Sequence, residues 1–200
     1  MELDHLAVAG ESLEAAVAHV EDALGVPMQP GGRHEMFGTH NFLLGVSDGL
    51  YLEAIAADPT ARPHRSPRWF DLDRFQGAPR LCNWICRCTD LAAVVAGMSV
   101  DAGQPLSLAR GDLRWQMAVP DTGVLPFDNT FPALIEWHSP HPAPLLTQQG
   151  CRLRHLVVAH PQAADLDAAL GLRDPRVVIE VGPAGFEATF DTADGRRVLR

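Results

Sequence analysis

The sequence predicts an α+β fold built from repeated β-α-β-β-β modules. The main observation is a short apolar motif that occurs three times, beginning at Leu3, Leu81 and Leu153. Alternation within each motif is typical of a strand, and the Ala- and Leu-rich stretch that follows is typical of a helix. A second observation is Glu53, near the end of the first copy, which finds an echo in Glu136 of the second.

The first module is predicted at residues 1–58. Ser12 offers a cap for a helix that Gly25 ends. The predicted elements are a strand at 3–9, a helix up to about residue 24, a weakly marked strand near 26–36, and strands at 41–46 and 50–55. The Asp48-Gly49 pair predicts a two-residue hairpin turn between the last two strands. With that turn, His40 shares a sheet face with Glu53.

The second module repeats this order and is predicted at residues 80–140. Its elements are a strand near 81–87, a helix near 90–98, and strands near 105–109, 113–119 and 133–138. The connector at 59–79 is rich in proline around Trp69-Phe70, so we expect it to pack its aromatic side chains rather than act as a free linker. Residues 141–200 form a third, shorter β-α-β-β-β-like copy that packs on the same domain, and they contain no counterpart of Glu53.

Composition limits the partners. The chain has 16 basic and 25 acidic residues and a net charge of -9, which argues against nucleic acid and anionic membranes. No apolar run reaches the roughly 20 residues that span a bilayer, and the N-terminus lacks the pattern of a signal peptide. We therefore expect a cytoplasmic protein. Nucleotide-binding loops and serine-nucleophile motifs are also missing from the sequence.

One histidine and two glutamates occupy matched places in the modules: His5, Glu53 and Glu136. Histidine and carboxylate side chains are common ligands of divalent metals. An unpaired buried carboxylate is costly, so Glu53 on an otherwise apolar strand is hard to explain as a core residue. The pattern suggests a metal site between the modules.

Four stretches of the first module carry a family resemblance: Leu3-Asp4-His5-Leu6, Gly31-Gly32-Arg33-His34, Gly38-Thr39-His40-Asn41 and Tyr51-Leu52-Glu53. They resemble the vicinal oxygen chelate superfamily of glyoxalases, extradiol dioxygenases and bleomycin-resistance proteins, and within it the glyoxalase-like domain branch. The resemblance covers residues 1 to about 140. It implies two modules whose sheets pair into a cupped half-barrel around a divalent metal, here Zn, Ni, Mn or Fe.

Carried over residue by residue, the resemblance implies metal ligands at His5, Glu53 and Glu136, with a fourth position at Asn83. An amide is a poorer ligand than imidazole for a borderline transition metal, so the site is weakened, rebuilt or empty. Two other histidines, His40 and His138, could repair it or line a substrate pocket. His40 lies about 13 Å along the strand from the position paired with Glu53.

Structural roles compete with these functional ones. His5 alone could be a core histidine whose hydrogen bonds are satisfied. Glu136 could form a buried ion pair with Arg114 or Arg87. Arg33 could hold the carboxylate of a ligand or belong to a solvated loop. The sequence does not choose between these alternatives.

Two functional classes remain. The first is a metal-dependent lyase or isomerase that acts on a small oxygenated molecule, with the metal as Lewis acid and Glu53 or Glu136 as base. The second is a metal-free binding protein of the bleomycin-resistance kind, in which Phe37, Tyr51, Trp115 and Trp137 stack against a ligand. Asn83 favours the second class, whereas Glu53 and Glu136 together favour the first, and the enzyme is our hypothesis from the sequence. An extradiol-type dioxygenase has less support, because Asn83 disrupts the two-histidine, one-carboxylate set.

The expected partner is a small-molecule substrate or ligand. The half-barrels of relatives also pair across chains, so a homodimer is one arrangement that the sequence permits. The third copy could close the monomer or build a dimer interface.

Overall fold

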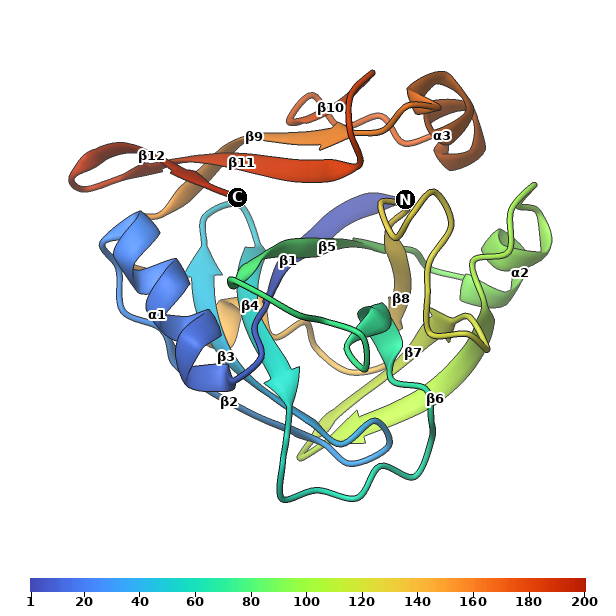
Figure 1. Cartoon of the computed structure of the whole chain (residues 1–200), viewed down its shortest axis with the longest axis horizontal. Coiled ribbons are helices and arrows are strands. Elements are labelled where there is room, and N and C mark those ends of the chain that lie inside the picture. The colour runs from blue at the N-terminus through green and yellow to red at the C-terminus, as the bar shows by residue number, and fades with distance from the viewer.

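The computed structural model describes residues 1–200, and its central feature is an eight-stranded sheet that curls into a half-barrel (Figure 1). Two β-α-β-β-β modules form this sheet, as the sequence predicts. The first consists of β1 (Glu2–Ala9), α1 (Leu13–Leu24), β2 (Gln29–His34), β3 (Thr39–Val46) and β4 (Leu50–Ala57). The second consists of β5 (Arg80–Arg87), α2 (Leu91–Ala96), β6 (Gln104–Arg110), β7 (Leu113–Val119) and β8 (Ala133–Trp137).

The modules join through β1 and β5, which pair antiparallel in the middle of the sheet. The strand order is β2-β3-β4-β1-β5-β8-β7-β6. Within each module the first and last strands pair in parallel, β1 with β4 and β5 with β8. Both halves of the concave surface therefore come from one chain, and the β1–β5 pair is the seam between them.

Helix α1 covers the outer face of the first module and contacts β4. It begins after Ser12, whose hydroxyl oxygen accepts a hydrogen bond from the backbone N–H of Ala15 at 3.2 Å. It ends at Gly25, where φ is 69°, a left-handed conformation that glycine adopts without a Cβ clash. Both ends agree with the sequence prediction.

The β3–β4 hairpin is shifted by one residue from the predicted pairing. The turn has three residues rather than two, so Glu53 lies opposite Leu43 instead of Leu44. Neighbouring side chains of a strand point to opposite faces, and a shift of one residue therefore exchanges the faces. The prediction that His40 shares the face of Glu53 is wrong, and Asn41 takes that place.

Strand β1 contains a bulge at Asp4. Leu3 pairs with Cys86 and His5 pairs with Ile85, which leaves Asp4 without a partner residue on β5. A bulge redirects a side chain away from the alternation of a regular strand. Asp4 therefore contacts His5, although strict alternation predicts opposite faces for the two side chains.

The connector between the modules fills part of the half-barrel. Its short helical turn η1 (Trp69–Asp71) lies inside the curl of the sheet (Figure 1). Trp69 and Phe70 are buried. The Trp69 ring stacks on Phe70 and on Phe37, with centroids 5.0 and 4.4 Å apart. The predicted packing of the connector's aromatic residues is confirmed.

The third segment has the predicted element order but a different strand order. It consists of β9 (Arg152–Ala159), α3 (Ala163–Leu170), β10 (Val177–Glu180), β11 (Gly185–Thr192) and β12 (Gly195–Leu199). Its sheet has the order β10-β9-β11-β12, so β9 lies between a parallel and an antiparallel neighbour. In the first two modules the opening strand pairs with the last one. The third segment therefore repeats the strand–helix opening and not the module's sheet.

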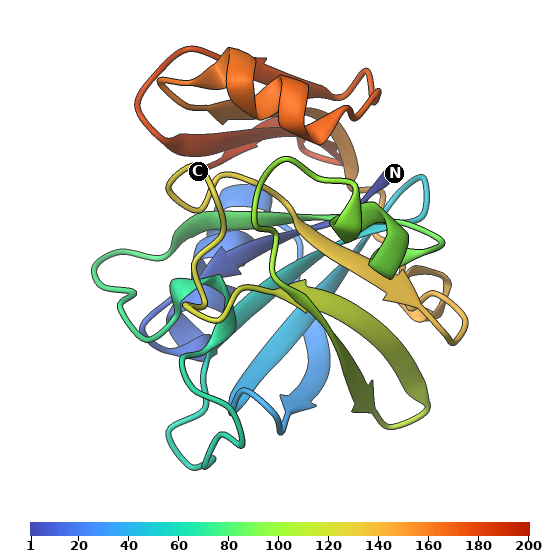
Figure 2. The ribbon, with the colours of Figure 1, turned by 90° about the vertical axis from the view of Figure 1, so that its right-hand side faces the viewer.

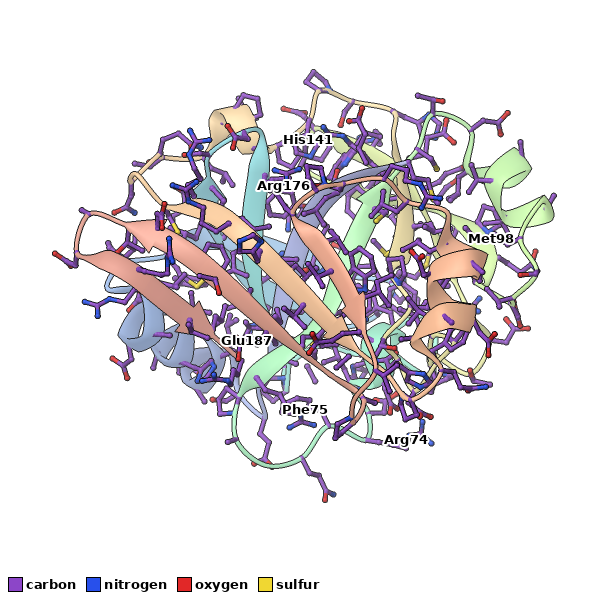
Figure 3. The ribbon with its side chains drawn as sticks, turned by 90° about the horizontal axis from the view of Figure 1, so that it is seen from above. Arg74, Phe75, Met98, His141, Arg176 and Glu187 are labelled. Atoms are coloured by element: carbon purple, nitrogen blue, oxygen red, sulfur yellow. The ribbon has the colours of Figure 1, made fainter.

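This sheet lies across the half-barrel as a separate layer (Figure 2). It packs on α1 through β12 and on β5 through β11. Seen from above, the strands of this sheet cross the half-barrel, and Glu187 lies on its inner strand β11 (Figure 3). One buried apolar cluster includes Leu156 and Phe190 together with the cores of both modules. No helix of the structure is both long enough and apolar enough to cross a membrane.

Candidate functional site

A cavity lies on the concave face of the half-barrel, between the two modules. Its volume is about 30 Å³. The polar residues that line it are His5, His34, Asn41, Tyr51, Glu53 and Arg110. The aromatic residues that line it are Trp69, Phe70, Trp115 and Trp137. Five of the six polar residues belong to the first module, and only Arg110 comes from the second.

His5 is held between two carboxylates. Its Nδ1 donates to Asp4 Oδ1 at 2.6 Å, and its Nε2 lies 3.7 Å from Glu53 Oε2. Burial disfavours the imidazolium form, but the hydrogen bond to Asp4 and the facing carboxylate of Glu53 raise the pKa of His5. The structure therefore favours a positively charged His5 between two negative groups.

Asp4 is buried behind His5 and has several donors. Burial opposes its ionisation, but hydrogen bonds from His141 and His5 hold its pKa below the usual range. The distances to Asp4 Oδ2 are 3.0 Å from His141 Nε2 and 3.1 Å from Trp137 Nε1. These contacts fix the carboxylate, and the carboxylate in turn fixes the orientation of the His5 ring, as outer partners of functional histidines commonly do.

Glu53 is buried on β4 and faces the cavity. Asn41 Nδ2 donates to Glu53 Oε1 at 2.5 Å, while Oε2 faces His5. Burial works against the carboxylate, but His5 and Asn41 lower its pKa to about 2. Glu53 is thus an ionised, partnered carboxylate, which agrees with the sequence argument that it is not an ordinary core residue.

Aromatic side chains enclose this pair. Tyr51 stacks on His5 with centroids 4.1 Å apart, and its hydroxyl oxygen lies 3.4 Å from His5 Nε2. Trp115 and Trp137 form the opposite wall, with centroids 5.6 Å apart. The structure brings together His5, Glu53, Tyr51 and the two tryptophans at one cavity. Phe37 is buried behind Trp69 instead of lining the cavity.

Arg110 closes the polar side of the cavity. Its NH1 group donates to Asn41 Oδ1 at 3.0 Å and lies 3.2 Å from His34 Nε2. Burial lowers the pKa of His34 to about 4, so His34 is neutral at pH 7 and its Nε2 accepts from Arg110. Its Nδ1 then donates to Thr39 Oγ1 at 3.0 Å. Arg110 was not among the site residues predicted from the sequence.

Glu136 does not line the cavity. Ile135 and Trp137 are its neighbours on β8 and both face inward, so Glu136 faces outward. Its Oε2 accepts a hydrogen bond from the backbone N–H of Leu91 at 2.7 Å, at the beginning of α2. His138 lies on the same side, 3.8 Å from the Glu136 carboxylate. The expected placement of Glu136 beside His5 and Glu53 is therefore wrong.

The alternative partners of Glu136 are occupied elsewhere. Arg87 pairs with Glu2 at 2.8 Å. Arg114 donates to the backbone carbonyl groups of Gly111 and Leu113. The buried ion pair of Glu136 with either arginine, which was the alternative to a metal-ligand role, is not formed.

Asn83 and Ala133 occupy the positions of the second module that match His5 and Glu53 of the first. Asn83 is fully buried, and neither atom of its side-chain amide has a hydrogen-bond partner. It lies opposite Ala7, which pairs with Glu53 on its other side. Ala133 is the second module's register equivalent of Glu53, and it packs near Trp69 and Phe70. The connector thus occupies the half of the concave face where a second carboxylate would lie.

The remaining candidates lie outside the cavity. His40 faces α1 on the outer side, near Glu14 and Asp58, and its Nε2 has no partner. Arg33 pairs with Asp58 at 3.3 Å and its side chain is 69% exposed. His40 and Arg33 are therefore not brought to the ligand-binding face.

Residues 3–172 match the family described as glyoxalase-like domain. The chain belongs to this family. A hypothetical protein from Staphylococcus aureus has a similar structure, with a TM-score of 0.59 and 14% identity over 100% of this chain and 85% of that one. At that identity the likeness concerns the fold alone.

Two methylmalonyl-CoA epimerases are more distant structural neighbours of this glyoxalase-like chain. The Streptomyces coelicolor enzyme has a TM-score of 0.44 and 19% identity over 70% of this chain and 99% of that one. The Mycobacterium tuberculosis enzyme has a TM-score of 0.42 and 19% identity over 68% of this chain and 86% of that one. No curated protein matches the sequence.

The residues at the cavity do not fit the divalent metal that the resemblance implied. That arrangement needs donors from both modules, whereas only His5 and Glu53 offer strong donors here. Nowhere in the structure do three or more His, Cys, Asp or Glu side chains gather as a metal site. The amide oxygen of Asn41 already accepts from Gly32 and Arg110. Two protein donors fall short of the three that a catalytic zinc site usually has.

Three side chains of the candidate site were not recognised in the sequence, for identifiable reasons. Asp4 reaches His5 only because of the bulge, which the sequence does not mark. Asn41 reaches Glu53 only in the observed hairpin register. Arg110 gave one usable signal, because it ends a strand that is directly followed by the Gly111-Asp112 turn. An arginine at the rim of a predicted cup is a candidate ligand contact.

Proposed function

We propose that this protein is an isomerase or lyase that moves a proton on a small carbonyl compound, with Glu53 as base and His5 as hydrogen-bond donor. The observation that carries the proposal is the buried Asp4–His5–Glu53 series at the cavity. The 3.7 Å between His5 Nε2 and Glu53 Oε2 exceeds a hydrogen bond. A ligand atom can therefore contact both groups.

The proposed reaction starts at a carbon next to a carbonyl group. Glu53 Oε2 accepts the proton, and the electron pair of the broken C–H bond forms a carbon–carbon double bond. The carbonyl electron pair moves to oxygen, where His5 Nε2–H donates a hydrogen bond to the developing negative charge. Return of the proton to another position gives isomerisation, and loss of a neighbouring leaving group gives elimination.

The environment supports this division of roles. In the ligand-free site, His5 lowers the pKa of Glu53 to about 2, which makes Glu53 a weak base. A substrate oxygen that takes over the hydrogen bond of His5 weakens this effect and raises the basicity of Glu53. Tyr51, Trp115 and Trp137 keep water away, which strengthens both interactions. Asp4 keeps His5 charged and correctly oriented.

Small-molecule binding without turnover is a second candidate. The stacked Tyr51 and His5 rings and the tilted pair of Trp115 and Trp137 favour it, because aromatic walls with a few convergent polar groups are typical of ligand pockets. In both candidates the partner is a small molecule rather than nucleic acid or a membrane.

The test is hydrogen–deuterium exchange of acetone, hydroxyacetone and pyruvate in D₂O, followed by NMR with and without protein. We expect catalysed exchange of at least one compound, and a loss of about hundredfold or more in Glu53→Gln. Glu136→Gln is the matched control, because it makes the same change on the outer face. Exchange that survives Glu53→Gln would contradict the mechanism. Binding of these compounds without exchange would favour the second candidate.

Metal content is measured on the same samples. We expect the exchange to persist after dialysis against a chelator, since only two strong donors lie at the cavity. One equivalent of a transition metal that is lost together with the exchange would overturn the metal-independent mechanism.

A further inference from the structure

Arg110 has an unusual position for a charged side chain. It is the one basic Arg or Lys residue that lines the cavity. Its guanidinium group has no carboxylate oxygen within 4.0 Å. Nearby Glu53 is already partnered by Asn41 and faced by His5. A partly buried guanidinium without a counter-charge is costly, and a negative ligand would compensate it.

The backbone is shaped to let Arg110 reach across the half-barrel. Its stem passes over Gly32 on β2, where an added Cβ would lie 2.6 Å from Arg110 Cδ. The only hydrogen bonds of the guanidinium use NH1, to Asn41 and His34. The Nε–H and the NH2 group make none, and they form one side of the planar fork. That side matches the two oxygens of a carboxylate.

The position of Arg110 is linked to that of Glu53. Asn41 accepts from Arg110 and donates to Glu53, so one side-chain amide separates the two groups. The guanidinium and the carboxylate are therefore roughly 5–7 Å apart. Only a short molecule can place a negative group on Arg110 and a reacting carbon at Glu53. The small volume of the cavity, about 30 Å³, leads to the same conclusion.

We propose that the substrate is a short-chain oxo acid whose carboxylate is bound by Arg110. The proposal rests on the function proposed for His5 and Glu53, and it names the class of molecule on which they act. The carboxylate pairs with Nε and NH2 of Arg110, the oxo group faces His5, and the carbon beyond it faces Glu53.

Pyruvate illustrates the chemistry. Glu53 Oε2 removes a proton from C3, the C3–H electron pair forms the C2–C3 double bond, and the C2 oxygen becomes negative beside His5. Reversal delivers a proton, or a deuteron in D₂O, from Glu53 to C3. The step consumes no oxidant, reductant or second substrate.

The experiment compares pyruvate with pyruvamide, its neutral isostere, and follows binding by the tryptophan fluorescence of the protein, because Trp69, Trp115 and Trp137 line the cavity. We expect the wild type to bind pyruvate at least about tenfold more tightly than pyruvamide. Arg110→Gln should lose this preference and keep its affinity for pyruvamide. Arg114→Gln, which removes an exposed arginine of β7, should behave as the wild type. If the role of Arg110 were purely structural, Arg110→Gln would bind pyruvate and pyruvamide more weakly by the same factor.

Arg110→Lys is a second variant, in case Arg110→Gln fails to fold. It keeps the positive charge and lacks the planar pair of donors that a guanidinium offers. We expect it to retain part of the preference for pyruvate. Equal binding of the two compounds by the wild type, an unchanged preference in Arg110→Gln, or no pyruvate binding at millimolar concentration would each overturn the proposal.

The rates of hydrogen–deuterium exchange distinguish carboxylate binding by Arg110 from proton transfer by Glu53. Equal catalysed exchange of acetone and pyruvate would support proton transfer and overturn the role of Arg110. An Arg110-dependent preference for pyruvate without any exchange would support the anion site and overturn proton transfer. Faster exchange of pyruvate that depends on both Arg110 and Glu53 is the expected result.

Discussion

The two modules of the half-barrel share a backbone plan and differ in chemistry. In the first, His5 and Glu53 lie on the paired strands β1 and β4 and face the cavity. In the second, the matched positions are Asn83, whose amide is unpartnered, and Ala133, which packs near the connector aromatics. The first module supplies the titratable pair, while the second supplies apolar walls and one arginine.

This difference shows that a repeated fold does not need to repeat its site. Trp69 and Phe70 cover the part of the second module's inner face around Ala133, while Trp115 and Trp137 of that module still line the cavity. A duplicated scaffold can thus keep one polar half and use the other half as packing. The following changes test how strictly the two halves are divided.

The largest effect is expected from placing a carboxylate in the second module. Ala133→Glu buries a charge near Trp69 and Phe70 without any of the donors that Glu53 has. We expect a loss of about 3 kcal/mol or more in the free energy of unfolding at pH 7, measured with urea. Ala133→Gln is the control, since it has the same size without the charge. If Ala133→Glu is as stable as the glutamine variant, the second module tolerates charge and the division is weaker than described.

The buried carboxylate of Glu53, in the first module, should make the free energy of unfolding depend on pH. The pKa of Glu53 is about 2 in the folded protein, against an ordinary value of 4.5. The unfolded chain therefore binds this proton first, and the contribution of Glu53 is present above pH 4.5 and is lost as pH falls through 2. We expect the free energy of unfolding of the wild type to fall more steeply than that of Glu53→Gln between these values. If the free energy of unfolding of the wild type and of Glu53→Gln changed with pH in parallel, the folded protein would not stabilise the carboxylate form of Glu53.

The smallest effect is expected at Glu136, the glutamate on the outer face. Glu136→Ala removes the acceptor for the Leu91 N–H at the beginning of α2. We expect a loss of about 1 kcal/mol in the free energy of unfolding and no change in proton exchange. Glu136→Gln keeps an oxygen acceptor and should lose less. A marked loss of exchange in either variant would return Glu136 to the catalytic set.

The order of strands and helices in the two modules could be predicted from the sequence, because the patterns that mark these elements are local. Ser12 and Gly25 mark the ends of α1, and the repeated motifs mark the strands that open each module. The third segment shows the limit of this approach. Its motif has the same pattern, yet β9 pairs with β10 and β11, because strand order depends on contacts that a local pattern does not contain.

The site was only partly predictable, and the errors have the same physical origin. The side-chain period of a strand is two, so an error of any odd number of residues in a turn or strand alignment reverses the assigned face. This happened at His40, where Asn41 faces the cavity, and at Glu136, where Ile135 and Trp137 do. Glu53 does line the cavity, and it was selected because the burial of a carboxylate needs an explanation in any register.

The contacts of Asp4 have a consequence for the order in which the protein can be completed during synthesis. Trp137 and His141 lie 133 and 137 residues further along the chain, so they leave the ribosome long after β1. Until then the carboxylate lacks these donors, and its burial is unfavourable. We infer that the N-terminal strand reaches its final state late, although N-terminal regions usually fold first. A nascent chain that ends before residue 141 would hold His5 and Glu53 without a finished site.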